Sequence, residues 1–511
     1  MRILIEKQNV ISRIICKNLP SGVPEALSES CSFWLKKAFI NIASRGFMNN
    51  GKTRHMHWSG KIMLYHRGRK TFRTGLLGRV VGVLKERGHD IEFRHAPDAP
   101  KTLISPGLKI SEDYKLRDYQ NDAVDTIMDS FTTCISIPTG GGKTLMAAKV
   151  IALDRCITVM IVHTRDLLIQ NREKLMEYLR YEDGSPVPIG MIGGGVIDIQ
   201  AISVATMQTL CRALGIKFTK DEKAKDKEDK TSVKGHELRI RKYLKEVNLL
   251  AWDECHRIPS RTAYTLAEKL TGVTHIFGMS ATPYRLDGKD LQMEAVVGPV
   301  VFKVTASDLI QRGLLATPII RIETIGGEKK EKRLGSDSNV KFLGTKKKSH
   351  AEVYKTFIVE NPERNALIVE HAKRLMSEGQ TVIVFVSRIA HGQELAKAIG
   401  CPLVHADLKR DGMGMEERAQ IFKDLGAKKV MGIVSTVGKE GIDIPALNAC
   451  IYASGGRDSM QALGRVLRRA EEKDVAFVVD FMDKTHDWLK RHSRERIRRY
   501  KAEPAFQVIG G

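Results

Sequence analysis

The sequence predicts an α/β protein with two tandem parallel-sheet domains preceded by a small α+β domain. The chain has 511 residues, of which 42% are apolar, enough for about three domains with cores of their own. From about residue 109, short apolar runs alternate with helix-favouring segments, which is typical of βαβ units and a mostly parallel sheet. The runs expected to form strands are residues 134–137, 157–162, 201–205, 248–252 and 274–279, then 381–386, 429–434, 449–452 and 475–479.

Breaks in this alternation predict the domain boundaries. A basic stretch punctuated by glycine and serine, residues 326–350, interrupts the pattern and is interpreted as a linker. Residues 221–230 carry five acids and four lysines, which favours a solvated insertion. The expected units are a basic N-terminal domain (1–108), a first parallel-sheet domain (109–325), a linker (326–360), a second parallel-sheet domain (361–483) and a basic C-terminal tail (484–511).

The N-terminal region mixes short strands with a helix. Apolar runs at residues 3–5 and 10–16 are followed by an amphipathic stretch at 24–43. Apolar residues then recur at helical spacing from residue 75 to 87, until Gly88 stops the helix. Residues 90–93 resume an extended pattern, so we expect a small α+β domain with a basic face.

Charge points to a polyanionic partner. The net charge is +23, and the excess is concentrated at the two ends of the chain. Residues 1–100 hold 18 basic and 7 acidic residues, and residues 484–501 hold 8 basic and 2 acidic ones. Solubilising charge or attraction to a membrane surface would also account for this excess.

Cysteine usage and hydropathy favour the cytoplasm. The eight cysteines are scattered without C-x-x-C pairs or histidine clusters at metal-ligand spacing, so we expect reduced thiols. No uninterrupted apolar run reaches the roughly 18 residues of a membrane span. The N-terminus also lacks the apolar stretch of a secretory signal, and we therefore expect a cytoplasmic protein without membrane contact.

A glycine-rich loop, Ser136-Ile137-Pro138-Thr139-Gly140-Gly141-Gly142-Lys143-Thr144, is the centre of the predicted chemistry. It lies between an apolar run and a helix-favouring segment, which is the order of a phosphate-binding loop. Backbone N–H groups of Thr139 and the three glycines would cradle the phosphates of ATP at a helix N-terminus. Lys143 would reach the β- and γ-phosphates, and the Thr144 hydroxyl would bind Mg²⁺. The alternative is a glycine-rich turn followed by a chance Lys-Thr pair.

A pair of carboxylates complements this loop. Asp253 and Glu254 follow the apolar run 249–252, at the carboxyl end of an expected parallel strand, where ligands bind in open α/β sheets. Asp253 could hold Mg²⁺, while Glu254 could orient and deprotonate the water that attacks the γ-phosphate. On its own, such a pair is usually the start of a solvated loop.

Asp253-Glu254-Cys255-His256 resembles the DExH box of superfamily 2 helicases, a family with two RecA-like domains, and the other family motifs follow in order. By this resemblance Arg117 and Gln120 of Leu116-Arg117-Asp118-Tyr119-Gln120 read adenine, and Gly441 and Asp443 of motif V help to bind the nucleotide. Ser280-Ala281-Thr282-Pro283 resembles motif III, which links ATP to nucleic acid. Four segments that resemble motifs Ia, Ic, IV and V would contact nucleic acid through Thr164, Arg165, Thr206, Gln208, Ser387, Arg388, Ser435 and Thr436.

The segment 461–468 resembles motif VI of the same family. Gln461, Arg465 and Arg468 are spaced four and three residues apart and would share one helix face. If the two domains face each other across a cleft, Arg465 and Arg468 become arginine fingers on the γ-phosphate. Family usage makes Gln461 a partner at that site. An exposed basic helix is the alternative.

The N-terminal domain resembles the leading domain of UvsW-type phage helicases, which remodel branched DNA. The likeness rests on Trp58-Ser59-Gly60-Lys61-Ile62, where the family commonly has Asp in place of Ser59, and on Thr74-Gly75-Leu76-Leu77. Trp58 would support the domain core or stack on a base. Histidines 55, 57, 66 and 89 are expected at the surface or in turns.

These features predict an ATP-dependent DNA helicase or translocase that uses ATP and Mg²⁺. It would unwind or branch-migrate forked or junction DNA during replication, recombination or repair, in the host cytoplasm if phage-encoded. The basic first domain would engage single-stranded, forked or junction DNA through phosphate contacts that do not select sequence. An RNA helicase, or a nucleic-acid annealing protein that does not hydrolyse ATP, remains the alternative.

Overall fold

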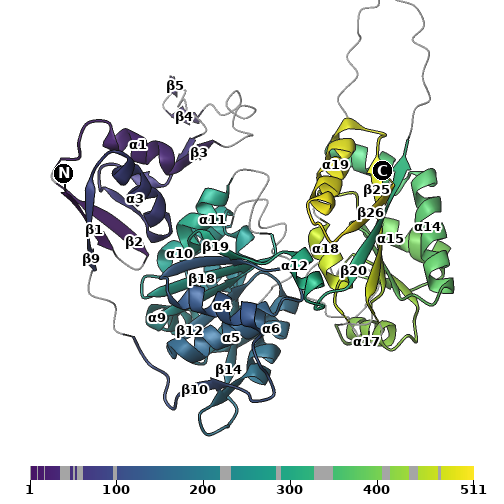
Figure 1. Ribbon diagram of the computed structural model, residues 1–511, viewed down its shortest axis with the longest axis horizontal. Coiled ribbons are helices and arrows are strands. Elements are labelled where there is room, and N and C mark those ends of the chain that lie inside the picture. Colours follow the sequence, from purple (N-terminus) through teal and green to yellow (C-terminus); the bar gives the residue numbers. More distant parts are fainter. Residues whose placement is uncertain are drawn as a thin grey trace, which may run out of the picture. The chain divides into compact units, whose positions relative to one another are not determined.

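The computed structural model describes residues 2–7, 10–16, 18–34, 47–49, 52–54, 61–95, 101–218, 232–282, 289–326, 349–405, 415–436, 447–457, 459–469 and 473–510 (Figure 1). The chain forms two compact units, Met1–Ile137 with Gly142–Lys303 and Pro138–Gly141 with Val304–Gly511. The charged insertion, most of the expected linker and Trp58 lie outside the described residues. Among the described residues, no helix is both long and apolar enough to cross a membrane.

The N-terminal part of the first unit is a mixed sheet with the strand order β7-β8-β2-β1-β9. Strand β9 runs parallel to β1, and the helices and strands together bury one apolar cluster. The helix expected at residues 75–87 is confirmed, as a 3₁₀ turn continued by an α-helix. The elements are β1 (Arg2–Lys7), β2 (Ile11–Ile15), α1 (Val23–Ser30), β7 (Tyr65–His66), β8 (Thr71–Arg73), η2 (Thr74–Leu76), α3 (Leu77–Glu86) and β9 (Asp90–His95), with two ribbons, β3 (Ser32–Trp34) with β6 (Lys61–Met63) and β4 (Phe47–Asn49) with β5 (Lys52–Arg54).

The rest of the first unit is an eight-stranded sheet, ordered β15-β14-β16-β12-β17-β18-β11-β19 and parallel except for β15. Its five expected strands are all present. The strands are β11 (Thr132–Ser136), β12 (Thr158–Val162), β14 (Ile189–Gly193), β15 (Val196–Asp198), β16 (Ile202–Thr206), β17 (Leu249–Asp253), β18 (His275–Ser280) and β19 (Val300–Lys303), and β10 (Leu108–Ile110) pairs with β13 (Leu179–Tyr181) beside them. The helices are α4 (Asp118–Met128), α5 (Lys143–Asp154), α6 (Arg165–Tyr178), α7 (Met207–Ala213), α9 (Glu237–Glu246), α10 (Arg261–Lys269) and α11 (Asp290–Val297), with the 3₁₀ turn η3 (Cys255–Arg257).

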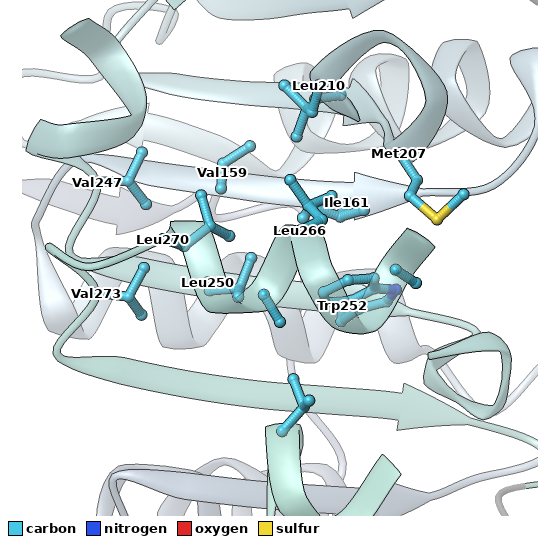
Figure 2. Close-up of a cluster of buried hydrophobic side chains, with 14 of the residues drawn as sticks. Val159, Ile161, Met207, Leu210, Val247, Leu250, Trp252, Leu266, Leu270 and Val273 are labelled. Carbon is cyan, nitrogen blue, oxygen red and sulfur yellow. The ribbon is translucent and has the colours of Figure 1, made fainter. Parts of the chain in front are cut away.

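The central strands of this sheet are apolar along their whole length because both faces are covered. All residues of β12, β16 and β17 are buried, as expected for parallel strands between two helical layers. Figure 2 shows one side of this core, where Val159 and Ile161 of β12 and Leu250 and Trp252 of β17 gather with Leu266 of α10. Such burial holds the carboxyl ends of these strands in fixed positions.

The second unit contains an all-parallel sheet of seven strands, ordered β22-β23-β21-β24-β25-β20-β26. The strands are β20 (Thr317–Ile325), β21 (Val382–Phe385), β22 (Leu403–Val404), β23 (Gly432–Ser435), β24 (Ala449–Tyr452), β25 (Val475–Asp483) and β26 (Gln507–Gly510). The helices are α12 (Ala306–Gln311), α13 (His350–Tyr354), α14 (Pro362–Ser377), α15 (Ile389–Ile399), α17 (Met415–Gly426), α18 (Met460–Val466) and α19 (Asp487–Lys501), with the π-helical turn η4 (Lys355–Val359).

The expected boundaries of the second domain were too narrow. Strand β20, which the sequence assigned to the first domain, pairs with β25 over nine residues and is an inner strand of the second sheet. The expected tail is also part of this domain, because α19 packs on β25 and β26 pairs with β20. The pairing of β20 with β25, a strand more than 150 positions away in the sequence, gives no local signal.

Candidate nucleotide site and nucleic-acid interface

The glycine-rich loop leads from β11 into α5, as predicted. Gly140 and Gly142 have φ angles of 87° and 82°, a region that favours glycine, and Gly142 is the N-cap of α5. The Lys143 ammonium donates to the Ile137 carbonyl over 3.2 Å, so it folds back toward the end of β11. A Cβ atom at Gly142 would lie 2.2 Å from Gln120 Nε2, which shows how closely the Gln120 amide packs on the loop.

The acidic pair lies at the carboxyl end of β17. Asp253 is 7% exposed, and Glu254 adopts a left-handed conformation with φ 49° that turns the chain out of the strand. Thr144 Oγ1 lies 3.0 Å from Asn171 Oδ1, and Asn171 Nδ2 donates to Asp253 Oδ2 over 3.3 Å. One asparagine side chain therefore joins the two residues that the sequence assigned to Mg²⁺.

Asn171 was missed by the sequence analysis, although a signal was present. It lies on the buried stripe of α6 with Leu167, Leu168 and Leu175, where an apolar residue would be expected. A polar side chain on such a stripe needs hydrogen-bond partners, and Asn171 finds them in Thr144, Asp253 and its own helix.

The two carboxylates differ in their electrostatics. Burial and the adjacent Glu254 raise the pKa of Asp253, and Lys143 opposes this shift. Burial also raises the pKa of Glu254, but the hydrogen bond to His256 and the charge of Lys143 outweigh it and lower that pKa. Glu254 is therefore ionised at neutral pH and can orient a water molecule.

Ser280 at the end of β18 connects this pair to the phosphate loop. Its hydroxyl oxygen lies 2.9 Å from His256 Nδ1 and 3.3 Å from Glu254 Oε2, and its carbonyl accepts from the Ile137 N–H over 3.1 Å. The Thr282 N–H also donates to the Ser280 hydroxyl. Of the motif III residues, Ser280 therefore contacts the DExH segment directly and Thr282 contacts Ser280, whereas Pro283 lies outside the described residues.

Oxygen donors at the Thr144–Asp253 position suit Mg²⁺. A hydroxyl and a carboxylate are hard ligands, and Mg²⁺ is bound in proteins through one or two carboxylates together with substrate phosphates. The neighbouring Lys143 and the N-terminus of α5 supply positive charge for those phosphates. The residues present therefore fit a magnesium nucleotide.

In the second unit, α18 carries Arg465 but ends before Arg468, so the single helix face expected for Gln461, Arg465 and Arg468 does not extend to Arg468. Arg465 lies in its last turn, and Arg468 follows beyond its end, in an isolated bridge to Leu315. The backbone of Gln461 belongs to α18, but its side chain lies outside the described residues, as do Gly441 and Asp443. The finger role of the arginines stays a prediction.

The residues expected to contact nucleic acid fall at the ends of adjacent parallel strands. Thr164 and Thr206 cap α6 and α7 after β12 and β16, and Gln208 Nε2 donates to the carbonyl of His163 over 3.0 Å. In the second unit, Ser387 and Arg388 follow β21 and are exposed. Ser435 is the last residue of the neighbouring strand β23, and Thr436 follows it.

Two of these hydroxyls are turned inward. Thr206 is fully buried and its oxygen lies 2.9 Å from that of Thr209, and the buried Ser435 hydroxyl donates to the Val404 carbonyl over 3.3 Å. Their side chains serve the fold, so a contact with nucleic acid at these positions would use other atoms of the loops. Arg165, in the first turn of α6, is half-buried.

Comparisons with known proteins match both sheets. The family described as type III restriction enzyme, res subunit, matches residues 113–285, and the helicase conserved C-terminal domain matches residues 364–470. The DNA 3'-5' translocase XPB2 of Sulfurisphaera tokodaii is 27% identical over 76% of this chain and 86% of its own length. The ATP-dependent DNA helicase uvsW of phage T4 is 23% identical over 94% of this chain and 95% of its own length.

Among solved structures, S. cerevisiae Dbp5 bound to RNA and ADP BeF3 matches with a TM-score of 0.50 and 14% identity, over 77% of this chain and 90% of that one. Likeness at this level shows the fold alone. It agrees with the two RecA-like domains that the sequence predicted, and the T4 relative extends the match over the N-terminal domain.

Proposed function

We propose that this chain, a superfamily 2 helicase resembling UvsW of phage T4, couples ATP hydrolysis to movement along DNA. It unwinds or branch-migrates forked or junction DNA during replication, recombination or repair. The observation that carries this proposal is the Thr144–Asn171–Asp253 chain of hydrogen bonds. It joins Thr144, at the end of the phosphate loop, to Asp253, and all three residues belong to the first unit. ATP hydrolysis needs these two groups close together.

The residues of the first unit divide the work of hydrolysis. Lys143, which donates to the Ile137 carbonyl, would bind the β- and γ-phosphates, and Thr144 and Asp253 would hold Mg²⁺, which would neutralise charge on the phosphate oxygens when bound. Glu254, ionised and held by His256, orients the attacking water and accepts its proton. Gln120, packed on Gly142, would contact the adenine.

The second unit supplies positive charge for the transition state. Arg465 and Arg468 act as fingers on the γ-phosphate, so hydrolysis depends on closure of the two domains. Closure changes the separation between the strand-end loops of the two sheets, and a bound strand gripped by both sets of loops would move with each cycle.

Charge on α19 supports a polyanionic substrate. Arg491, Arg494, Arg498 and Lys501 are exposed along one face of the helix, three or four residues apart. Three of them also border a hollow of about 490 Å³ whose lining includes Met482 and further residues of the helix. We assign this face to the DNA backbone, because phosphate contacts give affinity without sequence choice.

DNA is preferred to RNA as the substrate because the relatives that match most of the chain are named DNA translocases or helicases. An RNA helicase remains the second candidate, and the Dbp5 match is a complex with RNA. The hydrogen bonds of Lys143 to the end of β11, and of Asp253 to Asn171 and to the Glu254 N–H, support hydrolysis over a nucleic-acid annealing protein.

The test is a set of ATPase assays with single-stranded DNA, duplex, fork, four-way junction and RNA in parallel, at one stated salt concentration. We expect DNA to stimulate turnover and forks or junctions to be unwound or migrated. Stimulation by single-stranded RNA but not by DNA would select the RNA helicase. Binding without ATP turnover on any substrate would select the annealing protein and refute the proposal.

A further inference from the structure

The buried face of α19 is unusually polar. Arg496 and Tyr500 are completely buried, together with Asp480 of β25. Arg496 donates to both carboxylate oxygens of Asp480, through Nε over 2.8 Å and Nη2 over 2.9 Å. The Tyr500 hydroxyl lies 2.7 Å from the same carboxylate. A helix that needed only to cover the sheet would bury apolar side chains here.

This cluster reaches the start of α18. The Tyr500 hydroxyl also lies 2.5 Å from Oγ of Ser459, the residue at the N-cap of α18. Because an ionised carboxylate can only accept, the phenol proton goes to Asp480 and the Ser459 hydroxyl donates to the Tyr500 oxygen. Ser459 makes no side-chain capping bond to its own helix, so this contact with Tyr500 occupies its hydroxyl. Arg496 also donates to the Gly456 carbonyl, just before α18.

The other end of α18 is held by a second buried cation. Lys473, 4% exposed, donates to the carbonyl of Val466, the last residue of the helix, and to that of Leu447. An ammonium group on a terminal carbonyl complements the negative end of the helix. Burial lowers the pKa of Lys473 to about 8, so the amine is still mostly protonated at neutral pH. Both ends of the seven-residue α18 are therefore fixed by buried polar groups.

Stability alone is a weak explanation for these contacts. Buried ion pairs cost desolvation energy and can often be replaced by apolar residues without loss of stability, whereas they do fix geometry. Here the geometry that is fixed belongs to the helix of Arg465, with Arg468 just beyond it. A misplacement of about 1 Å at a reacting group can cost on the order of a hundredfold in rate.

We propose that Tyr500, held by Asp480 and Arg496, is a positioning residue for ATP hydrolysis, and that it sets the N-terminal end of α18 through Ser459. Lys473 does the same at the C-terminal end. The inference rests on the proposed arginine fingers, since it concerns the helix that carries Arg465. The C-terminal helix thus belongs to the ATPase machinery, while its outer face carries exposed cations.

The test compares Tyr500→Phe with Tyr243→Phe in the full-length chain. Tyr243 is a buried tyrosine of the first unit whose hydroxyl donates to the Thr158 carbonyl over 2.5 Å. Each change removes one buried hydroxyl and keeps the ring, so each should lower the stability of its own unit, measured as faster hydrogen exchange there. We expect Tyr500→Phe to lower kcat about tenfold at saturating DNA with KM for ATP unchanged, and Tyr243→Phe to leave kcat within about twofold.

A second variant tests whether a loss of activity comes from the Tyr500–Ser459 contact and not from a folding defect. Ser459→Ala removes only the hydroxyl that meets Tyr500, and the Tyr500–Asp480 contact can stay. If the contact carries the effect, Ser459→Ala lowers kcat alone, and the double variant with Tyr500→Phe loses little more than either single change. Equal kcat losses in Tyr500→Phe and Tyr243→Phe, or a full kcat in Ser459→Ala, would overturn the proposal.

Arg465→Ala, measured in parallel, separates this inference from the proposed function. If Arg465→Ala keeps full turnover, the finger assignment itself is wrong. If Arg465→Ala loses turnover while Tyr500→Phe matches its control, only the positioning role is wrong.

Discussion

Replacing Gly75 by alanine should weaken the packing of the N-terminal domain on the first helicase domain. Gly75 is buried in η2, which packs on α11, and a Cβ atom there would lie 2.1 Å from the Glu294 carbonyl oxygen and 2.8 Å from that of Ala295. Real Cβ atoms essentially never come within 3.0 Å of such atoms, so the two backbones must separate by at least 0.9 Å at Glu294. The contacts nearby, from Arg79 to both carboxylate oxygens of Glu294, would stretch as well.

The expected cost follows from that overlap. Overpacking a buried contact typically costs about 1–3 kcal/mol. The same substitution should raise stability at Gly78 and Gly82 of α3, where an added Cβ meets nothing within 4 Å. In a helix interior, alanine is better than glycine by roughly 0.5–1 kcal/mol. Within one short segment, a glycine-to-alanine change is thus expected to lower stability at Gly75 and to raise it at Gly78 and Gly82.

Hydrogen exchange of the full-length chain is the appropriate assay, because a multidomain protein does not give a single two-state transition. In Gly75→Ala, amides of η2 and α11 should exchange roughly ten- to a hundredfold faster, the equivalent of about 1.4–2.8 kcal/mol. In Gly78→Ala, exchange should slow within α3. Unchanged protection of α11 in Gly75→Ala, or faster exchange of α3 in Gly78→Ala, would refute the packing argument.

Four further predictions concern the catalytic residues, the exposed cations of α19 and the buried His391. Lys143→Ala should abolish ATP hydrolysis, and steady-state turnover in that variant would contradict the phosphate-loop assignment. Arg465→Ala should bind nucleotide normally but lose about 10³- to 10⁵-fold in turnover, as measured by nucleotide titration and ATPase rate. The double change Arg494→Ala and Lys501→Ala should weaken DNA binding and reduce the slope of log affinity against log salt concentration by about 2. An unchanged slope would exclude α19 from the DNA interface. Burial and Arg364 lower the pKa of His391 to about 4, so the unfolded chain binds more protons than the folded chain between about pH 4 and 6.5. The contribution of neutral His391 to the free energy of unfolding should therefore be complete above pH 6.5 and decrease toward pH 4. This decrease, measured as stability against pH, should be shallower in His391→Asn.

The parts of the site that the sequence predicted are those encoded locally. The strand, glycine loop and helix around Lys143 are contiguous, and Asp253-Glu254 directly follows an apolar run, so the order of residues was enough to place each segment. Parallel strands then bring the two segments to one edge of the sheet. The resemblance to family motifs predicted the roles of these residues, and the local pattern of apolar and polar residues predicted their positions in strands, loops and helices.

The parts that were missed depend on partners far away in the chain. Strand β20 gives an apolar-polar alternation, but only its pairing with β25 places it in the second domain. Asn171 and Tyr500 look like ordinary polar helix residues until Asp253 and Asp480 are seen beside them. The sequence shows that α19 is basic, but not that one of its arginines points inward to a carboxylate.

Buried polar side chains in this protein mark two different tasks. Arg364 and Asp483 form a fully buried ion pair that ties α14 to the end of β25, and within the described part of the chain the Arg364 guanidinium also donates to the Ala453 carbonyl. Asn171 and Tyr500 are also buried, yet Asn171 contacts Thr144, which the sequence assigned to ATP hydrolysis, and Tyr500 contacts Ser459, two residues before the segment 461–468. All of these groups are buried and carry the desolvation cost of burial. The identity of the partner therefore distinguishes a residue that stabilises the fold from one that fixes the catalytic geometry.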